Sequence, residues 1–117
     1  MLYRMAGYCR LSKEDGENRI SESIENQKKL ILEYVDKAGD MQLVRMYVDD
    51  GYSGTNYDRP GFQSMLVEIE AGRVGIVITK DLSRLGRNSA LTGLYTNFTF
   101  PQYGVRYIAI NDNYDTI

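Results

Sequence analysis

The amino-acid sequence predicts an α/β fold in which helices cover both faces of a largely parallel central sheet. Hydrophobic patterns typical of strands and of helices alternate along the 117 residues, as expected for a chain of βαβ units. Residues 74–79 (VGIVIT) are nearly all apolar, as in a strand that is covered on both faces. The chain shows no internal repeat, low-complexity segment or linker, so we expect one compact domain spanning residues 1–117.

The first half of the chain predicts two strands separated by a long helix. Residues 2–9 (LYRMAGYC) and 42–48 (QLVRMYV) have strand patterns. Residues 22–38 have a helical pattern, and Gly39 is a plausible helix stop. The apolar face of this helix consists of Ile24, Ile31, Tyr34, Val35 and Ala38.

A second helix is predicted at about residues 60–71, after a loop at 49–58 that is rich in Gly, Asn and Asp. We expect Asp58 to cap this helix, Pro60 to occupy its first turn and Gly72 to end it. The side chains expected to face the core are Phe62, Met65, Leu66 and Ile69.

A third helix is predicted at about residues 89–100, ended by Pro101, and a last strand at 105–110. In sheets of this class the ligand site lies outside the C-terminal ends of the strands. The loops at those ends begin near Arg10, Asp49, Lys80 and Asn111.

The absence of histidine and the presence of a single cysteine exclude several kinds of catalytic and metal site. The sequence has no histidine, which excludes a Ser-His-Asp triad, a Cys-His pair and every zinc site that needs imidazole. Its single cysteine, Cys9, excludes an internal disulfide and a cysteine cluster. Because Cys9 lies in an apolar strand pattern, we expect it in the core.

Charge and hydropathy limit the cellular location and the binding partners that the protein could have. No stretch approaches the length of a membrane-spanning helix, and the N-terminal MLYRMAGYCR is too short and too polar for a signal peptide. We therefore expect a cytoplasmic protein. The net charge is -2, from 14 Lys and Arg against 16 Asp and Glu, so the domain is not one that holds DNA by bulk electrostatics.

Polar residues that could carry chemistry follow three of the strands. Ser12 leaves the first strand and enters a polar loop beside Arg10 and Lys13. Arg84 and Arg87 are three residues apart, and a helical turn there would point them the same way. One edge of the sheet could therefore gather around Ser12 the side chains of Arg10, Arg59, Arg84 and Arg87.

A serine surrounded by arginines suits phosphoryl transfer better than acyl transfer. Guanidinium groups match phosphate oxygens in pairs and are permanently charged. They can stabilise the negative charge of a phosphoryl-transfer transition state without a metal. Because the chain has no histidine to take the serine proton, nearby cations are the remaining way to stabilise a developing alkoxide.

Each of these features also has a structural explanation. A serine after a strand is commonly a turn residue or a helix cap. Loop arginines are usually solvated or salt-bridged, and Asp81 could pair with Arg84 or Arg87. Asp49 and Asp50, with no further ligand beside them, are more typical of a solvated loop than of a metal site.

Four segments, in order along nearly the whole chain, together form a specific pattern. They are Tyr8-x-Arg10-x-Ser12 with Ser23-Ile24-x-x-Gln27, Asp50-Gly51-x-Ser53-Gly54 with Asp58-Arg59-Pro60-Gly61-Phe62, Asp81-Leu82-Ser83-Arg84-Leu85-Gly86-Arg87-Asn88, and Tyr103-Gly104-Val105-Arg106-Tyr107-Ile108-Ala109-Ile110-Asn111-Asp112. This combination resembles the catalytic domain of the resolvase/invertase serine recombinases. It is most similar to the large serine recombinases of mobile elements.

The resemblance implies a mechanism and a role for each matching residue. Ser12 would attack a DNA phosphodiester, form a 5′-phosphoserine bond and release a 3′-hydroxyl, with no cofactor and no metal. The matching arginines would bind and polarise the scissile phosphate, and Gln27 and Asp81 would support the site. Ser83 stands where many small members of the family have aspartate, which weakens any acid role there. The matching active-site arginines are Arg10, Arg59, Arg84 and Arg87.

The resemblance also implies partners outside this chain. The substrate would be double-stranded DNA, held by a homodimer that assembles into a tetramer in the full-length bacterial protein. Further DNA-binding domains would follow this catalytic domain, so residues 1–117 alone are expected to bind DNA weakly and not to recombine it.

Two other functions are compatible with parts of the pattern. A receiver-like, phosphate-sensing module could use Asp49, Asp50 and Lys80, although the acidic pair follows the second strand instead of the first. A catalytically inactive assembly domain is the other alternative. The presence of Ser12 together with all four arginines argues against it.

Overall fold

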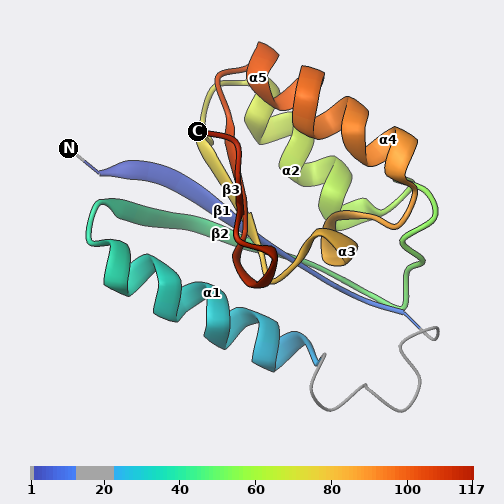
Figure 1. Ribbon diagram of the computed structural model, residues 1–117, viewed down its shortest axis with the longest axis horizontal. Coiled ribbons are helices and arrows are strands. Elements are labelled where there is room, and N and C mark those ends of the chain that lie inside the picture. The colour runs from blue at the N-terminus through green and yellow to red at the C-terminus, as the bar shows by residue number, and fades with distance from the viewer. Residues whose placement is uncertain (1, 13–22) are drawn as a thin grey trace.

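The computed structural model describes residues 2–12 and 23–117, and it has the α/β architecture that the sequence predicts (Figure 1). Its five-stranded sheet has the order β2-β1-β3-β4-β5. The strands are β1 (Tyr3–Leu11), β2 (Met41–Asp50), β3 (Ile76–Thr79), β4 (Arg106–Ala109) and β5 (Tyr114–Asp115). Strands β1 to β4 run parallel to their neighbours, and β5 runs antiparallel to β4.

Helices cover both faces of the sheet (Figure 1). Helix α1 lies below the sheet, whereas α2, α4 and α5 lie above it. The helical segments are α1 (Ile24–Ala38), α2 (Pro60–Glu70), α3 (Leu82–Leu85), α4 (Ser89–Leu94), the π-helix η2 (Tyr95–Thr99), α5 (Phe100–Gln102) and the 3-10 helix η3 (Ile110–Asp112). No helix in the described part of the chain is long and apolar enough to cross a membrane.

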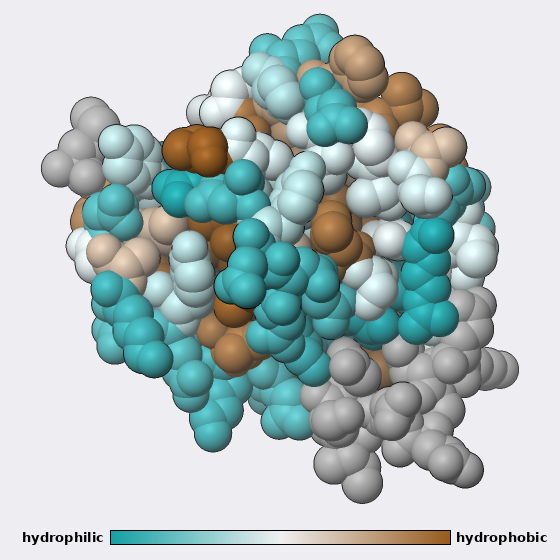
Figure 2. Space-filling view, in the orientation of Figure 1, coloured by the Kyte–Doolittle hydropathy of each residue, from teal (hydrophilic) through white to brown (hydrophobic). Residues whose placement is uncertain are grey.

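The core is divided by the sheet into two clusters. The cluster between α1 and the sheet is aliphatic and sulfur-containing. It consists of Met5, Cys9, Ile31, Met41, Ile76, Ile78 and Ile108. The cluster beneath α2 and α4 is rich in aromatic rings, among them Tyr8, Tyr57, Phe62, Phe100 and Tyr107. Figure 2 shows hydrophilic side chains over the lower part of the molecule, where α1 turns its outer face to solvent.

Helix α1 confirms the predicted stop and most of the predicted apolar face, but Ala38, which was expected on that face, is exposed. Ser23 is the N-cap, and its hydroxyl accepts a hydrogen bond from Asn26 N at 3.2 Å. Gly39 ends the helix in the left-handed conformation, with φ of 75°, where glycine has no Cβ to clash. The predicted first residue, 22, lies outside the described residues.

Helix α2 begins at Pro60 as expected, but the prediction that Asp58 caps it is wrong. The carboxyl of Asp49, at the end of β2, accepts hydrogen bonds from Gly61 N at 2.7 Å and from Phe62 N at 2.9 Å. A carboxyl group from a neighbouring strand thus satisfies the first amides of the helix, which have no partner within it. Asp58 instead uses its own amide to bond Asn56 Oδ1 at 3.0 Å.

The third predicted helix begins at Ser89 as expected, but it does not end where predicted. A separate four-residue helix, α3, precedes it, and Pro101 does not end it. The bonding pattern widens to a π-helix at Tyr95–Thr99, so that Phe100 N bonds Tyr95 O. This change in the hydrogen-bond ladder accommodates a residue that has no N–H. The chain leaves the helix at Gly104, whose φ is 70°.

Candidate active site

The candidate site lies at the C-terminal end of β1, where the strand order changes direction. Strand β1 pairs with β2 along its whole length, but with β3 only over Met5–Gly7. Beyond Gly7, the side of β1 that would face β3 is open, and α3 packs there. Such a switch point is where open α/β sheets bind ligands.

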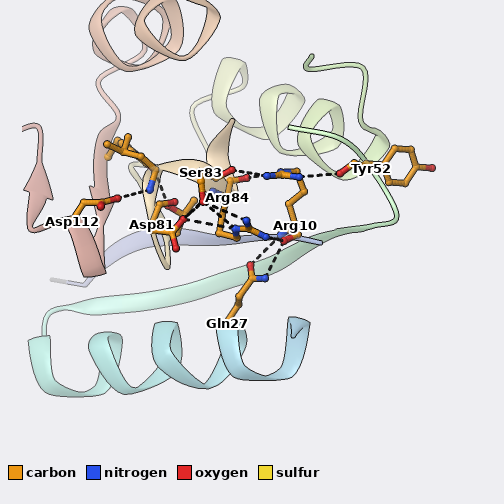
Figure 3. Close-up of polar contacts among 10 residues, drawn as sticks. Arg10, Gln27, Tyr52, Asp81, Ser83, Arg84 and Asp112 are labelled. Carbon is orange, nitrogen blue, oxygen red and sulfur yellow. Dashed lines mark hydrogen bonds and ion pairs between the residues drawn. The ribbon is translucent and has the colours of Figure 1, made fainter. Parts of the chain in front are cut away.

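Arg10 lies in this gap with its side chain fully buried. Its guanidinium group donates hydrogen bonds to three main-chain carbonyls (Figure 3). The acceptors are Tyr52 O at 3.0 Å, Ser83 O at 2.6 Å and Arg84 O at 3.3 Å. Arg10 therefore joins β1 to the loop after β2 and to α3.

The side chain of Arg84 in turn binds the main chain of Arg10. Its Nη1 donates to Arg10 O at 2.8 Å, so each arginine side chain binds the main chain of the other. The Arg84 side chain is 3 % exposed, and its Nε lies 3.7 Å from Asp81 Oδ1. Asp81 also caps α3 by accepting from Arg84 N at 3.2 Å, and Ser83 donates its hydroxyl to the same carboxyl. The structure thus pairs Asp81 with Arg84.

Gln27 supports the same point of β1 from the opposite face of the sheet. It is fully buried in α1, so it is not a surface residue of that helix. Its Oε1 accepts from Arg10 N at 3.1 Å, and its Nε2 donates to Arg10 O at 2.9 Å. The amide side chain therefore supplies the hydrogen bonds that a neighbouring strand would otherwise make.

Arg59 is buried in a different environment, above β1. Its guanidinium carbon lies 4.4 Å from the ring centre of Tyr57 and 5.3 Å from that of Phe62. It donates to Tyr8 Oη at 2.9 Å and to Leu85 O at 2.6 Å. Arg59 is therefore held by aromatic rings and by the end of α3.

Arg84 and Arg87 would point the same way only if one helical turn contained both, and the structure does not meet that condition. Helix α3 ends at Leu85, and Gly86 has an extended φ of 177°, so the two arginines do not share a helical face. Arg84 is buried, whereas Arg87 is exposed. The main-chain N of Arg87 donates to Gly54 O at 2.7 Å, which ties it to the loop after β2.

Ser12 follows the last residue of β1 and is 3 % exposed. The end of the strand is fixed just before it, because Leu11 O accepts from Gly51 N at 2.6 Å and from Tyr52 N at 3.2 Å. Ser12 is thus two residues from Arg10 on an anchored strand end. That all four guanidinium groups surround Ser12 stays a prediction, and Lys13 lies outside the described residues.

Comparison with known proteins places this chain in a family. The family description "Resolvase, N terminal domain" matches residues 5–117. The chain belongs to the resolvase family. No curated protein matched the sequence.

Solved structures agree with this assignment. The N-terminal catalytic domain of TP901-1 integrase is similar with a TM-score of 0.86 and 27% identity, over 97% of this chain and 81% of that one. A resolvase family site-specific recombinase from Streptococcus pneumoniae has a TM-score of 0.77 and 30% identity, over 97% and 75% of the two chains. The first ORF in transposon ISC1904 from Sulfolobus solfataricus P2 has a TM-score of 0.67 and 25% identity, over 90% and 65%.

Two residues of this resolvase domain were missed as parts of the site. Tyr8 donates its hydroxyl to Asp49 Oδ2 at 2.8 Å, so Arg59, Tyr8, Asp49 and the start of α2 form one continuous chain of hydrogen bonds. The interpretation of Asp49 as a solvated loop residue is wrong, because it is 2 % exposed. Strand alternation could have indicated this, since Asp49 shares a face with the buried Tyr47.

A third missed residue, Asp112, holds α3 from the far side. It follows β4, and its Oδ2 accepts from Leu82 N at 2.6 Å (Figure 3). The short helix that carries Arg84 is therefore held by two carboxyl groups, that of its own N-cap Asp81 and that of Asp112 at the end of η3. The contact could not be predicted from the sequence, because Asp112 is 30 positions from Leu82.

Burial keeps two titratable groups of β1, Cys9 and Tyr8, in their neutral forms. Burial raises the pKa of the Cys9 thiol to about 12, so Cys9 is not a thiolate nucleophile at neutral pH. Burial also raises the pKa of the Tyr8 hydroxyl above its usual value, which keeps it a neutral donor to Asp49. Within residues 2–12 and 23–117, no group of three or more His, Cys, Asp or Glu could hold a metal ion.

The receiver-like alternative loses its acidic pocket in this structure. Asp49, which that alternative needs, already accepts three hydrogen bonds, from Tyr8 Oη, Gly61 N and Phe62 N. Asp50 is exposed at the end of β2. The two carboxyl groups therefore serve different purposes and do not form a joint metal or phosphoacceptor site.

Proposed function

We propose that this resolvase domain catalyses site-specific recombination of double-stranded DNA, with Ser12 as the nucleophile. The observation that carries the proposal is the reciprocal contact of Arg10 and Arg84 at the end of β1. The side chains of Arg10 and Arg84 are both buried there. Arg10 stands two residues before Ser12, and the chain contains no histidine. Buried positive charge acts on a neighbouring phosphate through a medium of low dielectric constant, where it is strongest.

In the proposed step, Ser12 Oγ attacks the phosphorus of a DNA phosphodiester. The P–O bond to the 3′-oxygen breaks, the serine proton is lost, and the 3′-oxygen takes up a proton to leave as a hydroxyl. A 5′-phosphoserine bond remains, and its attack by a 3′-hydroxyl reverses the step and rejoins the strand. The number of phosphodiester-type bonds is unchanged, so religation needs no nucleotide cofactor.

In this proposal, exposed and buried arginines have different roles toward the phosphate. Arg87 is the exposed member of the set, and we assign it the first contact with the incoming phosphate. Arg10 and Arg84 stabilise the charge that develops on the phosphoryl oxygens and on Ser12. Arg59 adds positive charge from above β1, and Gln27 and Asp81 hold Arg10 and Arg84 in place.

The proposal extends to the assembly in which the domain works. We propose that this chain is the catalytic domain of a longer bacterial cytoplasmic protein, in which further domains supply most of the DNA affinity. The net charge of -2 supports this division, because an acidic domain gains little from phosphate contacts alone. Homodimers would assemble into a tetramer that cuts and exchanges two duplexes.

Trapping the covalent intermediate tests the proposal. The full-length protein would be mixed with a supercoiled plasmid carrying the DNA that flanks its native element, quenched in detergent and digested with nuclease. Mass spectrometry should find a 5′-phosphoseryl nucleotide on Ser12, absent in Ser12→Ala and present in Ser64→Ala, which changes an exposed serine of α2. A protein that binds this DNA without forming the adduct would instead be an inactive assembly domain.

A further inference from the structure

Gly54 lies where the loop after β2 touches two arginines at once. Its carbonyl accepts a hydrogen bond from Arg87 N at 2.7 Å. Two residues earlier, Tyr52 O accepts from Arg10 Nη1 at 3.0 Å, and Figure 3 shows the Arg10 side chain reaching toward Tyr52. This short loop therefore bridges Arg10 in β1 and Arg87 beyond α3.

The structure leaves no room for a side chain at this position. A Cβ on Gly54 would lie 2.7 Å from Arg10 Nη2, 2.9 Å from Arg10 Cζ and 3.0 Å from Arg87 Cγ. Gly54 does not have a positive φ, unlike Gly39, Gly51, Gly72 and Gly104. The requirement for glycine is therefore one of space, not of backbone conformation.

Arg10 cannot relieve that contact by a simple rotation. Its guanidinium group is buried and donates to Tyr52 O, Ser83 O and Arg84 O. Moving it would leave these carbonyls without the donor. If the loop moved instead, it would pull on Arg87 through the bond to Gly54 O. Either movement changes the placement of Arg10 relative to Arg87.

We propose that Gly54 is a positioning residue that sets the relative placement of Arg10 and Arg87 for the reaction at Ser12. This inference rests on the proposed function. Gly54 contacts neither the phosphate nor the nucleophile in this proposal, and it acts only through the two arginines. Its effect should therefore fall on the rate of strand cleavage and not on the affinity for DNA.

The first test measures the arginine itself and needs no activity. In the 117-residue chain, the NMR signal of the Arg10 Nε–H group should shift in Gly54→Ala. The matched control is Gly93→Ala in α4, where a Cβ would meet only Asn97 Nδ2, at an ordinary 3.8 Å. The control should leave the Arg10 signal in place, and an unchanged Arg10 signal in Gly54→Ala would overturn the proposal.

The second test measures cleavage in the full-length protein. Gly54→Ala should slow formation of the Ser12 adduct by about 100-fold, as expected for a displacement of about 1 Å, with unchanged DNA affinity. Gly93→Ala should react like the native protein. If both variants form the adduct at the native rate, the proposal about Gly54 is wrong while the proposed function stands. If the native protein forms no adduct, both are wrong.

A variant cycle keeps the proposal testable if Gly54→Ala folds poorly. Arg10→Met removes the Cζ and Nη2 atoms that the new Cβ would meet. Alanine at position 54 should therefore destabilise the native chain in urea, but add little destabilisation in the Arg10→Met background. An equal loss in both backgrounds would show that the contact with Arg10 does not determine the requirement for glycine.

Discussion

On the face of the sheet covered by α1, the buried side chains are mainly aliphatic, whereas the face covered by α2 and α4 buries aromatic rings, hydroxyls and charges. Gln27 is the exception on the α1 side, and it reaches the main chain of Arg10. On the other side, Tyr8 accepts from Arg59 and donates to Asp49, and Tyr107 is hydrogen-bonded to Thr79 at 2.6 Å.

This difference explains how a small domain can bury several arginines. An aliphatic layer offers no acceptors, so a charge there would be strongly unfavourable. A layer of tyrosines, with loop carbonyls at its edge, offers both ring faces and hydrogen-bond acceptors. The α1 side therefore provides stability, and the α2 side provides the polar framework of the candidate active site.

The largest effect is expected from breaking the polar framework at Asp49. Asp49→Ala leaves Tyr8 Oη, Gly61 N and Phe62 N without their acceptor, and should lower the free energy of unfolding by about 4 kcal/mol. Urea denaturation measures this loss. The neighbouring exposed residue provides the control, because Asp50→Ala should change stability by less than about 0.5 kcal/mol. Equal effects of the two variants would contradict the assigned capping role.

Two buried residues of α1 should differ in their effects on stability and on reaction rate. Gln27 and Ile31 are one helical turn apart, and both are fully buried. Ile31→Ala should cost about 3 kcal/mol of stability without changing the rate of adduct formation per folded molecule. Gln27→Leu should cost only about 2 kcal/mol, yet slow that reaction, because it removes the bonds of Gln27 to Arg10 N and O. Circular dichroism in urea and the Ser12 adduct assay separate the two outcomes, and equal reaction rates would count against the supporting role of Gln27.

The smallest effect is expected from a charge pair near the surface. Arg106 holds Asp115 with two hydrogen bonds, at 2.9 and 2.6 Å, and these lower the pKa of the Asp115 carboxyl. A lowered pKa contributes stability that is present above the ordinary carboxyl pKa of about 4 and is lost as the pH falls through the lowered value.

Asp115→Asn should therefore cost less than about 1 kcal/mol at neutral pH. The difference from the native chain should disappear toward about pH 2, where the carboxyl of the native chain is protonated. Thermal unfolding at several pH values measures this. Asp36→Asn, at an exposed position on α1, is the control, and a difference that persisted at low pH would show that the carboxylate charge is not responsible.

The α/β class, the order of the main elements and the residues at several of their ends could all be predicted from the amino-acid sequence. Periodicity is a local property, so the hydrophobic faces of α1 and α2 and the apolar strand β3 could be predicted from neighbouring residues alone. Gly39 and Pro60 could be placed for the same reason, because each acts through its own backbone. Strand β5 was missed because its two residues are too few for a pattern.

The pairing of the polar residues, in contrast, depends on the tertiary fold. Asp49 caps a helix that begins beyond the next loop, Gln27 bonds a strand 17 residues earlier, and Arg59 bonds Tyr8 across 51 positions. A buried polar group must find a partner, but which partner it finds depends on which segments the fold brings together. The candidate arginines could therefore be identified from the sequence. Their division into buried Arg10, Arg59 and Arg84 and exposed Arg87 could not, because packing determines which side chains solvent can reach.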